Sequence, residues 1–215
     1  MSLFSKIVLA SGNAGKIREF EAFFQPYSVK VIPQKELGVI EAAEPHVTFV
    51  ENALAKARNA ARATGFPALA DDSGICATAL NGAPGIYSAR FAGEKASDNQ
   101  NNQKLSKALQ PFTNKQVWYA CSLVLVRHAN DPFPIIAEGT WEGEWIDNPR
   151  GENGFGYDPH FLISEYRQTA AEISSTLKNR ISHRGKALIE LMNKLDELYL
   201  RAGLKIPDIP HYVEK

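Results

Sequence analysis

Strand-like and helical patterns both occur along this chain, which indicates a protein of mixed α and β structure. A short apolar run bounded by polar residues, at 7–10, is typical of a buried strand. The segments 117–126 and 135–145 are rich in β-forming residues and predict an antiparallel pair of strands. A regular apolar pattern over 187–199 predicts an amphipathic helix with its apolar side in the core.

The first half of the chain continues this alternation. After the strand at 7–10 a turn leads into a helix, and a second strand is expected at 29–32. Thr48 and Glu51 have the spacing of a capping box, so a helix should start at Thr48. Gly65 should end that helix.

The second half adds a polar helix, expected at 98–109, and two irregular segments. The segment through 84–90 is rich in turn residues, which suggests a loop with a functional or gating role. The tail from Gly203 contains two prolines and is expected to be loosely attached.

The composition is that of an ordinary globular protein: 215 residues, 44% hydrophobic and 22% charged. This length allows one large domain or two lobes around a shared core. A formal net charge of zero argues against a protein that coats nucleic acid. The start of the chain does not resemble a signal peptide, and no apolar run approaches the roughly 18 residues of a membrane span. We therefore expect neither a nucleic-acid polymer nor a membrane as partner.

The two cysteines, Cys76 and Cys121, each lie beside apolar residues. Free cysteine is among the most frequently buried residue types, so we expect two buried, reduced thiols. Reduced thiols are typical of the cytoplasm, which is the expected location. No pair or cluster of cysteine and histidine predicts a zinc site.

A possible anion site lies between the first strand and the first helix. Free backbone N–H groups and the helix dipole favour an anion at such a turn, and Lys16 adds a cation. The turn is not a P-loop, because Ile17 stands where that motif needs Ser or Thr. An ordinary strand-to-helix turn remains the alternative. The turn residues are Ser11, Gly12, Asn13, Ala14, Gly15 and Lys16.

Two adjacent acids, Asp71 and Asp72, follow a short apolar run. Paired carboxylates are costly to bury alone, because desolvation penalises their charged form. A magnesium site would remove this cost, and so would a solvated turn, so both readings stay open. If the strand continues through them, the two side chains point to opposite faces and need not share a role.

Three polar residues share one face of the helix expected from Thr48. Asn52, Lys56 and Asn59 are spaced by four and three positions. That face is either simply solvated or carries a lysine aimed at a phosphate.

A glycine-rich loop with two aromatic residues spans 151–159. Glycine lets the backbone approach a flat ligand closely, and an aromatic ring can stack on a base. A plain glycine loop is the alternative. His183 and Arg184 precede the last helix, where a cation opposes the helix dipole. An anionic or carbonyl-bearing ligand is the better reason for their presence.

Six motifs occur in order along the chain. They are Ser-Gly-Asn-x-x-Lys, Phe-Val-Glu-Asn-Ala-Leu-x-Lys-Ala-Arg, Ala-Asp-Asp-Ser-Gly, Pro-Gly-Ile-Tyr-Ser-Ala-Arg, Gly-Phe-Gly-Tyr-Asp-Pro and Ser-His-Arg-Gly-Lys-Ala-Leu. Together, over roughly residues 6–200, they resemble the inosine/xanthosine triphosphate pyrophosphatases, which remove non-standard purine nucleotides.

The resemblance implies an α/β fold, in which a long mixed β-sheet with flanking helices forms two lobes around a central cleft. It implies a single domain of this type over 1–215, with 203–215 as the tail, and a homodimer. The implied reaction is Mg²⁺-dependent hydrolysis of ITP, dITP or XTP between the α and β phosphorus. The products would be the monophosphate and pyrophosphate.

The resemblance also implies residue roles. Asp72 is similar to the family's catalytic base and metal-linked carboxylate, with Asp71 as an alternative base. Glu44 resembles the second metal carboxylate, and Glu41 stays open as the alternative. The substrate-binding positions are Ser11, Gly12, Asn13, Ala14, Gly15, Lys16, Lys56, Ser73, Phe155, Gly156, Tyr157, Asp158, Lys178, His183 and Arg184.

The chemistry requires such groups. A triphosphate brings about four negative charges, which Lys16, Lys56 and Mg²⁺ would offset. Asp72, or a metal-bound water that it orients, would then activate water for in-line attack on the α-phosphorus. His183 and Arg184 would donate hydrogen bonds to the oxygen at C6 of the base, which adenine lacks. Two other functions stay open: cleavage at the γ-phosphorus, and nucleotide binding without catalysis.

Overall fold

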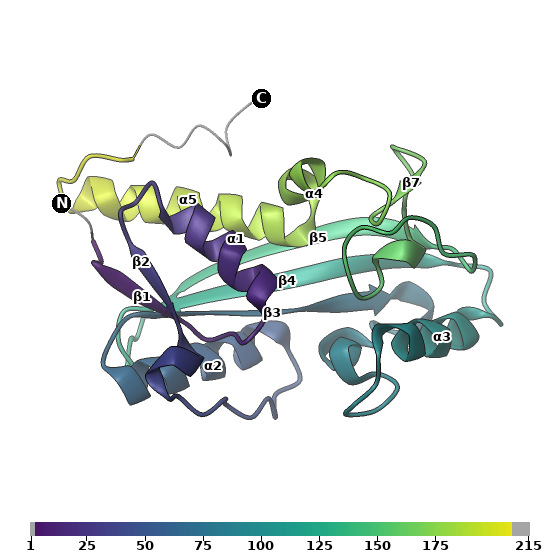
Figure 1. Cartoon of the computed structure of the whole chain (residues 1–215), viewed down its shortest axis with the longest axis horizontal. Helices are drawn as coiled ribbons and strands as arrows, with labels where there is room; N and C mark the ends of the chain where they lie inside the picture. Colours follow the sequence, from purple (N-terminus) through teal and green to yellow (C-terminus); the bar gives the residue numbers. More distant parts are fainter. Residues whose placement is uncertain (1–2, 208–215) are drawn as a thin grey trace. The chain divides into compact units, whose positions relative to one another are not determined.

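Within residues 3–207, the part of the chain that the computed structural model describes, seven strands form a mixed sheet (Figure 1). β1 pairs in parallel with β2 and β3, whereas β6 pairs antiparallel with β5 and β7. Their order across the sheet is β2-β1-β3-β4-β5-β6-β7. This sheet and its flanking helices confirm the expected α/β class. The strands are β1 (Lys6–Leu9), β2 (Lys30–Pro33), β3 (Ala68–Ala77), β4 (Gln116–Val126), β5 (Ile135–Trp145), β6 (Phe161–Ile163) and β7 (Gln168–Thr169).

Local sequence signals explain where the helices begin and end. Thr48 caps α2 by accepting a hydrogen bond from the backbone N–H of Glu51, and Gly65 ends α2 in the left-handed conformation. Both positions were predicted, and so was the range of α3. The helices are α1 (Ala14–Phe24), α2 (Phe49–Thr64), α3 (Asp98–Leu109), α4 (Ser175–Ile181) and α5 (His183–Arg201), with short 3₁₀ helices η1 (Gln34–Leu37), η2 (Thr78–Leu80), η3 (Gly85–Arg90) and η4 (Asp158–His160).

The chain divides into two compact units. The first comprises the described parts of Met1–Asp72, Ser122–Glu138 and Ala187–Lys215, and the second comprises Ser73–Cys121 and Gly139–Lys186. β3, β4 and β5 each belong to both units, because the divisions fall within these strands. The single domain expected over the whole chain stays a prediction.

The core of the first unit lies on both faces of its strands. On one face the alanines of α2 pack against Val8, Ala70 and Val124. On the other face lie α1 and α5 (Figure 1), where the rings of Tyr27 and Tyr199 are 5.5 Å apart. The strands of this unit are therefore covered by helices, as continuous apolar runs predict.

The core of the second unit is aromatic. Tyr119 of β4 packs against Trp141 of β5 and Phe161 of β6. Leu105 and Leu109 of α3 are fully buried in the same cluster. Tyr157, in the loop that follows β5, belongs to the same cluster.

Some remaining expectations can be checked directly. Cys76 and Cys121 are buried, as predicted, and burial raises the pKa of the Cys76 thiol to about 11. Among the described residues, no helix is both long enough and apolar enough to cross a membrane. The segment expected as a loop at 84–90 contains the 3₁₀ helix η3. Most of the expected tail, 208–215, lies outside the described residues.

Candidate active site

The adjacent acids Asp71 and Asp72 lie inside β3, which continues past them to Ala77. Both are buried, with 2% and 9% of their surface exposed. The solvated turn that the sequence left open is therefore wrong. Two buried acids are tolerated because each is paired with a cation. The two carboxylates have different partners, as predicted for consecutive residues of a strand.

Asp71 forms an ion pair with Lys16 in the first turn of α1. The turn before α1 is held by its own side chains. Oδ1 of Asn13 accepts hydrogen bonds from the N–H groups of Gly15, at 2.8 Å, and Lys16, at 3.1 Å. Oγ of Ser11 accepts from the N–H of Asn13 at 3.2 Å. An anion bound at this turn would therefore have to replace Oδ1 of Asn13 at the backbone N–H groups and Asp71 at the ammonium of Lys16.

Asp72 pairs with Lys56 of α2, for which phosphate binding was one of the two interpretations of the sequence. Nζ of Lys56 lies 2.8 Å from Oδ1 of Asp72 and 2.9 Å from Oε1 of Glu44, so it joins the two carboxylates. Burial raises the pKa of Asp72, and the ion pair with Lys56 opposes that rise. Burial lowers the pKa of Lys56, but its carboxylate partners outweigh this and the net shift is upward.

The segment that carries Glu44 is held at both ends by the same face of α2. Asn52 binds the backbone of His46, accepting from its N–H at 3.1 Å and donating to its carbonyl at 3.3 Å. Asn59 donates to the carbonyl of Ile40 at 2.8 Å. With Lys56 between them, these asparagines form a three-point clamp on residues 40–46. The face is therefore not merely solvated.

Glu41, the alternative metal carboxylate, lies elsewhere. A Cβ built on Gly12 would be 3.2 Å from Oε1 of Glu41, so this glycine leaves room for the acid beside the phosphate turn. The side chain of Ala14, another predicted residue of the turn, lies outside the described parts of the structure.

The acid cluster suits a hard cation with few protein ligands. Over residues 3–207, no group of three or more His, Cys, Asp or Glu side chains is arranged to hold a metal. However, Oδ2 of Asp72 is buried and has no hydrogen-bond partner in this part of the chain. Mg²⁺ commonly binds one or two carboxylates and completes its shell with water and phosphate. Glu44 and Asp72 match that requirement.

The glycine-rich loop of the second unit presents one aromatic ring and buries the other. Phe155 is 57% exposed. Tyr157 is buried, and its hydroxyl donates to the carbonyl of Ser88 at 2.7 Å. Asp158 is also buried, where it pairs with Lys178 and accepts from the hydroxyl of Tyr119 at 3.1 Å. Of the two rings predicted to meet a base, Phe155 is the accessible one.

His183 and Arg184 lie at the start of α5 and are both buried. The imidazole of His183 stacks on Tyr119, with the ring centroids 4.6 Å apart. The guanidinium of Arg184 donates to Oγ of Ser73 at 3.3 Å. Gly185 makes this arrangement possible, because a Cβ there would collide with the carbonyl of Asn179. The structure thus brings together Ser73 and Arg184, two of the residues for which substrate binding is a prediction.

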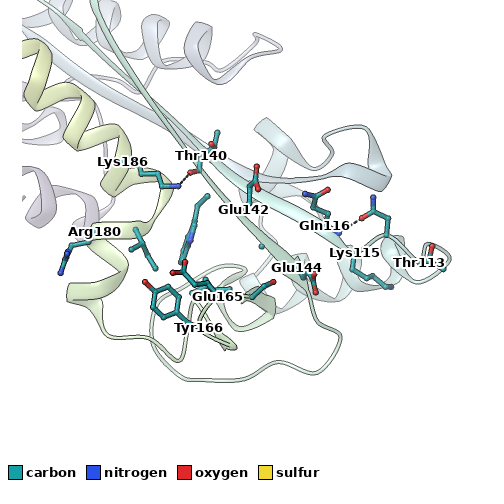
Figure 2. A pocket seen from close by; sticks show the side chains of 16 residues that line it. Thr113, Lys115, Gln116, Thr140, Glu142, Glu144, Glu165, Tyr166, Arg180 and Lys186 are labelled. Carbon is teal, nitrogen blue, oxygen red and sulfur yellow. Dashed lines mark hydrogen bonds between the residues drawn. The ribbon is translucent and has the colours of Figure 1, made fainter. Parts of the chain in front are cut away.

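A hollow of about 970 Å³ also lies in the second unit, but none of the predicted site residues is among the described residues that line it (Figure 2). Its rim carries three glutamates and three basic residues, so their charges cancel. Two of those cations are engaged: Lys115 donates to the carbonyl of Leu109, and Lys186 donates to that of Thr140. The hollow does not suit a triphosphate, because a polyanion needs an excess of positive charge.

Sequence reasoning missed Tyr119 as a residue of the site. Burial, together with the carboxylate of Asp158, raises its pKa well above the ordinary range, so its hydroxyl is a neutral donor. Tyr119 links Asp158 to His183 by a hydrogen bond and a ring stack. No local signal identifies it, since a tyrosine in a β-rich run reads as a core residue.

Known proteins resemble this chain over most of its length. A family model described as the Ham1 family matches residues 7–194. A dITP/XTP pyrophosphatase of Neisseria meningitidis serogroup B is 61% identical over 191 residues, which cover 88% of this chain and 96% of the relative. A dITP/XTP pyrophosphatase of Nitrosomonas europaea is 58% identical, covering 90% of this chain and 95% of the relative.

A solved structure agrees with these matches. A HAM1 protein from Coxiella burnetii superimposes with a TM-score of 0.87 at 47% identity, covering 89% of this chain and 98% of that one. Both the sequence matches and this fold similarity far exceed what chance would produce across nine-tenths of a chain. The chain belongs to the Ham1 family.

Proposed function

We propose that this protein hydrolyses the non-standard purine nucleoside triphosphates ITP, dITP and XTP to the monophosphate and pyrophosphate. The observation that carries the proposal is the ion-paired cluster of Asp72, Lys56 and Glu44, in a chain whose relatives are named dITP/XTP pyrophosphatases. Such a reaction removes these nucleotides from the nucleotide pool.

Asp72 is the proposed base. Its Oδ2 is the acceptor that no protein donor uses among the described residues, so it is available to take a proton from water or to orient water for in-line attack. Asp71 is the alternative base, but it is paired with Lys16. In this proposal Asp71 instead orients Lys16.

Lys16 and Lys56 are the proposed phosphate ligands. Each now neutralises a carboxylate, so a phosphate oxygen would compete with that acid for the ammonium group. Ser11, Gly12, Asn13, Ala14 and Gly15 supply the turn beside Lys16. This arrangement keeps the cations positioned when no substrate is present.

Glu44 and Asp72 are the proposed ligands of Mg²⁺. When bound, Mg²⁺ supplies positive charge that neutralises phosphate oxygens and favours attack by an anionic nucleophile. The asparagine clamp on residues 40–46 keeps Glu44 at the place where such an ion is needed.

Residues of the second unit are proposed to recognise the purine base of the substrate. Phe155 offers an exposed ring for stacking, beside Gly156 and Tyr157. His183 and Arg184 are the proposed donors to the oxygen at C6 of hypoxanthine or xanthine, and an adenine would leave those donors unpaired. Asp158, Lys178 and Ser73 hold this group of residues in place.

One assay tests the proposal. Pyrophosphate and orthophosphate release are measured from ITP, dITP, XTP, GTP and ATP, with Mg²⁺ and with a chelator. We expect pyrophosphate from the first three and little from the last two. Orthophosphate as the product would point to cleavage at the γ-phosphorus, and nucleotide binding without turnover would point to a non-catalytic module.

A homodimer and a cytoplasmic location complete the proposal. Sedimentation equilibrium of the purified protein should give twice the mass of the 23.7 kDa chain. Fractionation of the native cells should place the protein with cytoplasmic markers, in keeping with its two buried thiols.

A further inference from the structure

Two side chains of α3 hold one residue of the glycine-rich loop. Oδ2 of Asp98 accepts a hydrogen bond from the N–H of Gly156 at 2.7 Å. Nδ2 of Asn102 donates to the carbonyl of the same glycine at 3.0 Å. Asp98 and Asn102 are four positions apart, so they project from one face of the helix. Both polar groups of Gly156 are thereby fixed to a helix that is packed into the aromatic core.

The environment of Asn102 indicates more than a surface contact. The residue is 7% exposed, and its Oδ1 is buried without a hydrogen-bond partner among the described residues. A buried, unsatisfied acceptor is unfavourable, and an apolar side chain of similar size would avoid it. An apolar residue could not make the hydrogen bond to Gly156 that Asn102 makes.

Asp98 also does something that helix formation does not require. Ser97 and Gln100 already form a complete capping box at the start of α3. An acid in the first turn interacts favourably with the helix dipole, and this does not require its side chain to point at the loop. The direction of Asp98 toward Gly156 is therefore a separate feature.

The residue fixed by these contacts neighbours the exposed ring of Phe155. Gly156 has a φ of 63°, a left-handed conformation that suits glycine. On its other side, the N–H of Phe155 donates to Oδ2 of Asp158 at 3.0 Å. The ammonium of Lys178 lies 5.0 Å from the centre of the Phe155 ring. The backbone that carries this exposed ring is thus held by hydrogen bonds at Phe155 itself and at Gly156.

We infer that Asp98 and Asn102 are positioning residues for base recognition, which act through Gly156 to present the ring of Phe155. A ring held in its binding orientation loses less entropy when a base stacks on it. The inference rests on the proposed function for the identity of the ligand, a purine nucleotide. The positioning itself rests on the contacts to Gly156.

Hydrogen exchange tests the positioning without any ligand. We compare the wild type with Asp98→Ala, Asn102→Ala, Asp98→Asn and Ser97→Ala, and follow amide exchange over residues 153–158. Exchange should accelerate at least about tenfold in the two variants that lose a contact with Gly156. Asp98→Asn should restore protection, because its carboxamide oxygen can still accept. Ser97→Ala weakens the start of the same helix and should leave the loop unchanged.

A double-mutant cycle tests the action through Phe155. Binding of inosine monophosphate is measured by calorimetry for Asp98→Ala, Phe155→Ala and the combined variant. Each single change should weaken binding about tenfold, in the range of one lost stacking contact. The combined variant should bind no more weakly than Phe155→Ala alone.

The outcomes separate the two proposals. Unchanged exchange at 153–158 in Asp98→Ala and Asn102→Ala, or additive losses in the cycle, would overturn the positioning role. If the wild type releases no pyrophosphate from ITP, the proposed function fails, while the exchange experiment still decides the role of Asp98 and Asn102.

Discussion

The ammonium of Lys56 lies 2.8 Å from Oδ1 of Asp72, inside a cluster that also holds Glu44. This lysine provides the positive charge for the buried carboxylate of Asp72 and the half-buried carboxylate of Glu44. A divalent cation bound by the same carboxylates would provide that charge in its place. Lys56 and the metal are therefore alternative ways of neutralising one pair of acids, and this relationship can be measured.

Replacing Lys56 with methionine should lower the free energy of unfolding by about 3 kcal/mol in metal-free buffer, because it leaves two carboxylates without their cation. Added Mg²⁺ should recover part of the loss, so the stabilisation by Mg²⁺ should be larger in Lys56→Met than in the wild type. Urea denaturation with chelator and with Mg²⁺ measures both quantities.

Lys194→Met is the matched control. Lys194 pairs with Glu190 at 2.5 Å, but both side chains are about two-fifths exposed, so the change should cost no more than about 1 kcal/mol and should not respond to Mg²⁺. Equal stabilisation of Lys56→Met and wild type by Mg²⁺ would remove Glu44 and Asp72 as the metal ligands.

Asp72→Asn should lower kcat on ITP by about 10³-fold, because it removes the proposed base. Asp71→Asn should retain most of the turnover and show its effect mainly on stability, through loss of the ion pair with Lys16. Steady-state kinetics of the two variants under saturating Mg²⁺ make the comparison. The reverse ranking would exchange the roles of these acids.

The pH dependence should reflect the buried position of Asp72. Burial raises its pKa, an effect only partly opposed by Lys56. If the ionised form is active, kcat/KM should decrease as the solution is acidified. This decrease should begin at a higher pH than it would for an exposed aspartate. The folded state binds this proton more tightly than the unfolded chain. The contribution of Asp72 to the free energy of unfolding therefore decreases as pH rises from the ordinary to the raised pKa.

Urea denaturation across that pH window checks the second part. Asp72→Asn should remove this component of the pH dependence, and the difference between variant and wild type should shrink as the pH falls. A difference that is constant with pH would show that the pKa of Asp72 is not raised in the folded protein.

Asn52→Ala should raise the Mg²⁺ concentration that gives half-maximal activity by about tenfold, since outer partners of a ligand tune metal affinity. The reason is that His46 is released and Glu44 is no longer held against Lys56. Activity at saturating Mg²⁺ should change much less. Thr48→Ala is the control: it removes the cap of the same helix, at about 1 kcal/mol, and keeps the contact between Asn52 and His46.

Arg184→Ala should narrow the ratio of kcat/KM between ITP and ATP by at least about tenfold, because one donor to the C6 oxygen is lost. Lys186 lies two positions after Arg184 and donates to the carbonyl of Thr140. Lys186→Ala should leave the ratio unchanged. An unaltered ratio in Arg184→Ala would exclude that residue from base recognition.

Much of the fold is predictable from this sequence because its signals are local. The cap at Thr48, the glycine that ends α2 and the polar pattern of α3 depend on neighbours within a few residues. The strand pattern of β5 likewise persists in the structure. These segments form as their own residues prefer, so no knowledge of the rest of the chain is needed.

The site is less predictable because its residues depend on distant partners. Asp71 and Asp72 favour a turn by composition, yet they continue a strand since Lys16 and Lys56, from two different helices, neutralise them. Tyr157 reads as a stacking residue and is instead buried against Ser88. In each case the deciding interaction joins residues at least 16 positions apart.

The side chains of β3 point alternately to the two faces of the sheet, which restricts where insertions and deletions can be tolerated. An inserted or deleted residue between Ala68 and Asp71 would turn every later side chain of the strand to the other side. Asp72 would then be directed away from Lys56 of α2 and Asp71 away from Lys16 of α1, so both ion pairs would be lost. Related sequences that differ in length should therefore differ in their connecting loops and keep this strand free of gaps.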